Sequence, residues 1–70
     1  MSEPITIERQ IAAVRHEISM RNRVYPRWVA AGKMTQAKAD EGIAAMQAVQ
    51  KTLEQLRDER QAKTNPGLFG

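Results

Sequence analysis

Apolar residues recur along the first half of the chain at alternating intervals of four and three. The stripe consists of Ile7, Ile11, Val14, Ile18, Arg21, Tyr25 and Trp28. This spacing places all seven on one face of an α-helix, with a period close to that of a coiled coil. Arg21 alone does not suit burial, so we expect its guanidinium to reach the edge of the helix or to meet an acid. The pattern predicts a helix over about residues 6–31, with Thr6 or Ser2 as its N-cap.

A second stripe with the same alternation follows after a short interruption. It consists of Ala39, Gly42, Met46, Val49, Leu53 and Leu56, and Ile43 widens it at one end. Thr35 stands where an N-cap residue is expected, with the apolar Met34 before it. Charges of mixed sign after Leu56 indicate a solvated last segment. The pattern predicts a second helix over about residues 35–62.

Proline and glycine, which interrupt or end helices, occur where the first stripe ends and the second has not yet begun. Pro26 cannot donate a hydrogen bond to Asn22, and its ring crowds the preceding turn, so the first helix should kink at 26 or begin again there. Gly32 supplies the left-handed conformation that closes a helix. The stretch from Val24 to Thr35 is therefore the predicted hinge of the chain.

Two helices of nearly equal length joined by a tight turn predict an all-α antiparallel helical hairpin. Folding at residues 32–33 sets Tyr25 and Trp28 beside small residues such as Gly42. We expect a lead-in over residues 1–5, the hairpin over 6–63 and a flexible tail over 64–70. Two helices cover each other on one side only, so we expect two hairpins to pair into a homodimeric four-helix bundle.

Composition removes several classes of chemistry. The 70 residues include no cysteine and one histidine, which excludes disulfides and thiolate metal sites, and we expect no metal and no cofactor. His16 and Glu17 are adjacent and diverge on a helix, and no nucleophile or phosphate-loop motif accompanies them. We therefore expect no enzymatic activity. No apolar run is long enough for a membrane span and no signal pattern begins the chain, so a cytoplasmic location is expected.

Positive charge is concentrated in the first half of the chain, where residues 1–33 carry six Lys or Arg against three Glu. Residues 34–70 carry five of each sign. Around the hinge the cations lie among the only Trp and the only Tyr. We define the candidate hinge surface as Arg21, Arg23, Tyr25, Arg27, Trp28 and Lys33. Cations beside flat rings suit a protein contact, or the stacking and phosphate contacts of a nucleic acid or nucleotide, whereas the two rings could instead simply close the end of the hairpin.

Residues 23–29, Arg-Val-Tyr-Pro-Arg-Trp-Val, together with Gly32-Lys33-Met34, Ala39-Asp40 and residues 43–49, resemble a class of short open reading frames carried by tailed phages and prophages. The resemblance covers about residues 8–56. It implies an origin inside an infected or lysogenic bacterium more than an activity, and it carries no functional residues across.

Small phage proteins of this size commonly bind a host protein, including defence components, or bind nucleic acid or sequester a nucleotide signal. By analogy, the leading expectation is a non-enzymatic accessory protein that binds a host or phage protein through the hinge surface. The alternatives are a nucleic-acid or nucleotide-binding module that uses the same surface, and a purely structural oligomerisation element.

Overall fold

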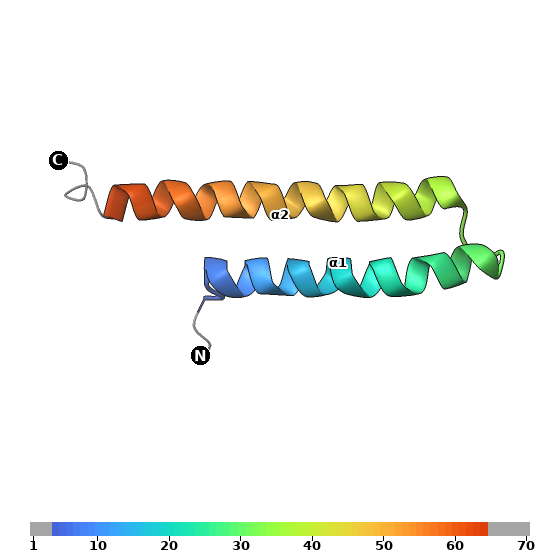
Figure 1. Cartoon of the computed structure of the whole chain (residues 1–70). Helices are drawn as coiled ribbons and strands as arrows, with labels where there is room; N and C mark the ends of the chain where they lie inside the picture. Colours follow the sequence, from blue (N-terminus) through green and yellow to red (C-terminus); the bar gives the residue numbers. More distant parts are fainter. Residues whose placement is uncertain (1–3, 65–70) are drawn as a thin grey trace.

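The computed structural model describes residues 4–64, which form two α-helices joined by a short turn. Helix α1 runs over Ile7–Ala30 and helix α2 over Gln36–Thr64. The helices lie side by side and antiparallel (Figure 1). The described residues contain no strand, so the predicted all-α hairpin is confirmed. Neither helix is long and apolar enough to cross a membrane. The predicted tail lies outside the described residues, except for Thr64.

Both helices begin with the predicted threonine cap. The hydroxyl of Thr6 accepts a hydrogen bond from the backbone N–H of Arg9 at 3.2 Å, and Glu8 lies in the first turn. The hydroxyl of Thr35 accepts one from the backbone N–H of Lys38 at 3.1 Å. Each bond satisfies a donor that the helix itself cannot pair, which typically contributes about 1 kcal/mol.

The end of α1 is closed through Gly32. Its φ of 76° is the left-handed conformation that glycine adopts without a Cβ clash. The N–H of Gly32 donates to the carbonyl of Val29 at 3.0 Å, and the N–H of Lys33 donates to the carbonyl of Trp28 at 2.9 Å. These two bonds form a Schellman motif, which ends α1 and turns the chain toward α2.

Pro26 lies inside α1 and not at the start of a new helix. The helix continues through it from Ile7 to Ala30. The predicted restart at Pro26 is therefore absent, whereas a bend of the axis at this position stays a prediction.

The helix–helix interface follows the predicted stripe of α1 closely. Ile7, Ile11 and Ala39 are buried. Val14, Ile18, Arg21 and Tyr25 are half-buried, and Trp28 at the end of the stripe is exposed. The burial pattern confirms the period of α1 and the face that it turns toward α2.

On α2 the predicted stripe leaves the interface as it moves away from the hinge. Val49 and Leu56 are 42% and 37% exposed, whereas the polar residues Gln50 and Arg57, each one position further along, are half-buried. A stripe with a 3.5-residue period drifts by about 20° per heptad around a helix of 3.6 residues per turn. The drift rotates Val49 and Leu56 out of the interface. The second stripe was expected to face the first helix along its whole length, and for these two residues that prediction is corrected.

Polar residues of α2 face α1 along one edge of the hairpin. The carboxylate of Glu54 accepts hydrogen bonds from Arg15 at 2.9 Å and from Gln50 at 3.0 Å. Arg15 is on α1, so this group joins the two helices near the end opposite the turn. The pair is solvent-exposed and its contribution to stability is accordingly small.

The ring of Tyr25 on α1 lies close to the backbone of α2 at Gly42. A Cβ atom at this position would lie 3.1 Å from Cε2 of Tyr25 and 3.3 Å from its hydroxyl oxygen. Any side chain at residue 42 would therefore have to displace the Tyr25 ring.

We predict that Gly42→Ala gains less than the roughly 0.5–1 kcal/mol that this substitution normally brings to a helix interior, or loses stability, because the methyl group crowds Tyr25. In a Tyr25→Ala background the same change should recover the normal gain. Urea midpoints of the four proteins measure the coupling. A full gain in the presence of Tyr25 would contradict the close approach.

A second prediction concerns pH. Hydrogen bonds from Gln50, and then from Arg15, lower the pKa of Glu54 below its ordinary value of 4.5. A carboxylate with a lowered folded pKa contributes stability above its unfolded pKa, and this contribution is lost as the pH falls through the folded pKa. Glu54→Gln should therefore be less stable than the wild type at pH 7 and equally stable near about pH 2. A constant difference across that range, measured by urea unfolding, would disprove the assignment.

Candidate functional site

Two members of the hinge surface, Arg21 and Tyr25, are tied into the helix–helix interface. Arg21 donates from Nε to the carboxylate of Glu17 at 2.7 Å and from Nη1 to the carbonyl of Gly42 at 2.9 Å. Its Cζ lies 5.7 Å from the centroid of the Tyr25 ring. The predicted meeting of Arg21 with an acid is confirmed, and its donors are directed toward this chain's own groups.

The charge of Arg21 is well compensated where it lies. The hydrogen bond that Arg21 donates to the Glu17 carboxylate raises the pKa of Arg21 above its ordinary value, although partial desolvation opposes the effect. A salt bridge at this spacing on one helix also stabilises the helix itself. Arg21 therefore links α1 to the backbone of α2. We call its contacts with Glu17, Tyr25 and the carbonyl of Gly42 the clasp.

Trp28 is placed differently from its neighbour Tyr25. The two ring centroids are 5.7 Å apart and the rings are tilted by 32°. Tyr25 is half-buried against Gly42, whereas 43% of Trp28 is exposed. A large ring that is held by an aromatic neighbour on one side and is open to solvent on the other is a typical anchor for a protein contact.

The remaining cations of the hinge surface are exposed. Arg23 and Arg27 are one helical turn apart on the side of α1 that faces away from α2. Lys33 is exposed in the turn. The structure thus brings Tyr25 close to both Arg21 and Trp28. Arg23, Arg27 and Lys33 do not join this group.

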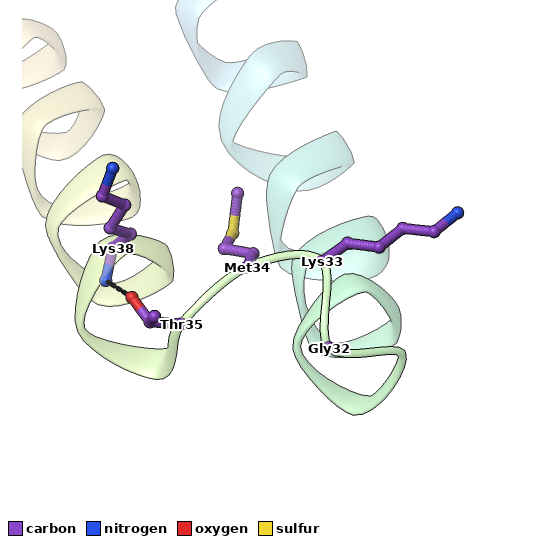
Figure 2. A pocket seen from close by; sticks show the side chains of 5 residues that line it. All are labelled: Gly32, Lys33, Met34, Thr35 and Lys38. Atoms are coloured by element: carbon purple, nitrogen blue, oxygen red, sulfur yellow. Dashed lines mark hydrogen bonds between the residues drawn. The ribbon is translucent and has the colours of Figure 1, made fainter.

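A hollow lies beside the turn, lined by Gly32, Lys33, Met34, Thr35 and Lys38. Figure 2 shows that the amino groups of Lys33 and Lys38 point away from each other and out of the hollow. A phosphate needs several donors directed at one point. The side chains that line this hollow do not provide that arrangement.

Acidic and histidine side chains do not gather into a metal site within residues 4–64. No group of three or more His, Asp or Glu in this range could hold a metal ion. His16 and Ser19 are both exposed.

The sequence pattern missed several residues that matter at the surface. Met34 and Lys38 line the hollow beside the turn. Met20 is 36% exposed and Val24 is half-buried on α1, outside the predicted stripe. Their spacing of four residues, one helical turn, is the signal that could have identified them as a second apolar row.

We predict that Arg21→Gln lowers the urea midpoint of unfolding clearly more than Arg23→Gln does, because Arg21 joins Glu17, Tyr25 and the carbonyl of Gly42. Arg23 is exposed and serves as the matched control on the same helix. Circular dichroism during urea titration measures both. Equal midpoints for the two variants would show that the clasp does not contribute to the fold.

Comparison of the chain with protein-family models, with curated proteins and with solved structures finds no match in any of the three. The comparisons therefore assign no function to this fold. Function has to be argued from the hinge surface and from the faces that the hairpin presents.

Proposed function

We propose that the chain is a small non-enzymatic phage accessory protein that binds a host or phage protein in the cytoplasm of an infected bacterium. The contact uses the exposed part of the hinge surface, which consists of Arg23, Arg27, Trp28 and Lys33. The observation that carries the proposal is the 43% exposure of Trp28, whose backbone carbonyl accepts a hydrogen bond from the backbone N–H of Lys33 in the turn. Trp and Arg are the residues that most often dominate the binding energy of protein interfaces.

The position of the cations favours a protein partner over a nucleic acid or a nucleotide. Arg21 is the cation that lies 5.7 Å from a ring, and it already donates to Glu17 and to the carbonyl of Gly42. The amino groups of Lys33 and Lys38 diverge (Figure 2). A surface of this kind fits a partner with an apolar pocket for Trp28 and acidic groups around it.

The proposal also includes pairing of two hairpins into a homodimeric four-helix bundle. The described residues bury only three apolar side chains, Ile7, Ile11 and Ala39. Domains of this size rarely obtain enough stability from one small core, and oligomerisation is a common remedy in a chain without cysteine.

The test of partner binding is Arg27→Glu. It should weaken the complex about 30-fold or more, the effect of losing an interface hot spot, and leave the helix content unchanged. Lys51→Glu is the matched control, since it changes the charge equally on an exposed position of α2. A host protein captured from lysate by the wild type, identified, and titrated against all three chains provides the measurement. Equal affinities would remove the hinge surface from the proposal and would favour a purely structural oligomerisation element.

The nucleic-acid alternative is tested with the single tryptophan. Trp28 fluorescence should show no saturable change on titration with short oligonucleotides or mononucleotides. A saturable change that fades as salt rises would replace the protein-binding proposal with phosphate recognition, because contacts to phosphates release counterions.

A further inference from the structure

Exposed apolar side chains gather on one side of the hairpin. The contact of Arg21 with Glu17 and with the carbonyl of Gly42 marks this edge of the interface. On α1, Met20 follows Glu17 by three residues and Val24 follows it by seven. On α2, Val49 follows Gly42 by seven residues and Leu56 by fourteen. Such intervals keep residues on the same side of a helix, so we define the apolar face as Met20, Val24, Val49 and Leu56.

The opposite side of the hairpin has a different character. The ion pair between Arg15 and Glu54 marks its edge, at 2.9 Å. Gln47 precedes Glu54 by seven residues and is exposed on the same side, as is Asp40. One broad side of the hairpin is thus polar, and the other carries exposed apolar residues from both helices.

The amount of exposed surface matches that of a protomer. The chain exposes 5703 Å², whereas a compact monomer of 7.9 kDa exposes about 4,400 Å². The excess of about 1,300 Å² is larger than the roughly 800 Å² that each partner buries in a stable interface. Its radius of gyration of 16.7 Å also exceeds the roughly 11 Å of a compact chain of this length.

We infer that the apolar face packs against the same face of a second copy, with the helices of the two copies antiparallel. This inference rests on the proposed pairing into a bundle and specifies the face and the orientation. The register is known from Arg15 opposite Glu54 and Tyr25 opposite Gly42. In this register Met20 and Val49 lie at about the same level, midway along the apolar face.

A twofold axis at the level of Met20 and Val49 makes the face complementary to itself. Each of these two residues then meets its own copy. Toward the ends, Leu56 of each copy falls opposite Gly42 of the partner subunit. Large side chains thus face small ones at both ends, which is the packing that a helical bundle requires.

Charge selects the antiparallel orientation over the parallel one. Residues 19–46, at the hinge end, carry five Lys or Arg against two Asp or Glu. A parallel dimer would bring two such ends together, whereas an antiparallel dimer separates them by the length of the hairpin. Like charges in proximity are unfavourable in an interface.

The face is tested with a charge. Val49→Glu should lower the dimer association constant about 100-fold or more, because it buries an unpaired carboxylate in the interface. Gln47→Glu adds the same charge on the polar side and should leave the constant within about twofold. Sedimentation equilibrium measures both. A monomeric wild type at micromolar concentration would disprove the pairing itself, whereas a dimer that Val49→Glu leaves intact would disprove the choice of face alone.

The orientation is tested by cross-linking, which does not depend on the folding of a charged variant. The chain contains no cysteine, so a single introduced thiol can pair only with its own copy. The Met20→Cys variant, treated with oxidised glutathione, should form a disulfide-linked dimer with the bundle arrangement of the wild type. The Gln47→Cys variant, treated in the same way, should not. Efficient cross-linking only in a mixture of Met20→Cys and Val49→Cys would establish the parallel orientation and overturn the inference. Equal cross-linking of Gln47→Cys would overturn the face.

Discussion

The close approach of Tyr25 to Gly42 sets the register of the whole hairpin. Glycine at residue 42 lets the ring lie on the backbone of α2, where a Cβ atom would be only 3.1 Å away. The same closeness brings the carbonyl of Gly42 within 2.9 Å of Arg21. One small residue thus determines the depth of the tyrosine, the partner of the arginine and the level at which the helices face each other. Trp28, one turn further along, lies partly in solvent, with 43% of it exposed.

Much of the fold follows from local rules and could be predicted from the sequence. Thr6 and Thr35 cap because their hydroxyls can replace a missing acceptor, and Gly32 closes α1 because it adopts a positive φ without strain. The stripe of α1 followed from helical periodicity. An acid beside Arg21 was one of two outcomes expected from the cost of burying its charge, the other being a side chain that reaches the edge of the helix. These features depend on residues within about one turn of each other, which a linear pattern contains.

What the pattern could not supply is the phase of α2 relative to α1. A heptad stripe stays in an interface only if the helices supercoil around each other. Here Val49 and Leu56 drift outward, and Gln50 takes an inward position. The candidate site shows the same limit. The six residues of the hinge surface were found from composition and from their proximity in the sequence. Whether a cation lies over a ring, as Arg21 does, depends on side-chain direction, which the sequence pattern does not give.

The drift of the α2 stripe also links the two proposed surfaces. It removes Val49 and Leu56 from the core of the hairpin and adds them to the side on which Met20 and Val24 already lie. Trp28 of the hinge surface lies four residues beyond Val24 of this face, which is about one helical turn. In a chain this small, a residue lost from the interior becomes available as a contact residue.

The short turn has a consequence for the order in which the chain folds. Arg21 and Gly42 are separated by 21 residues, whereas Arg15 and Glu54 are separated by 39. Closing the longer loop first would cost about 0.6 kcal/mol more in chain entropy. Contacts near the turn therefore form early, and the helices zip together toward their free ends. We therefore expect the contacts around Gly42 to form in the folding nucleus, and changes at Arg15 or Glu54 to act mainly on the rate of unfolding.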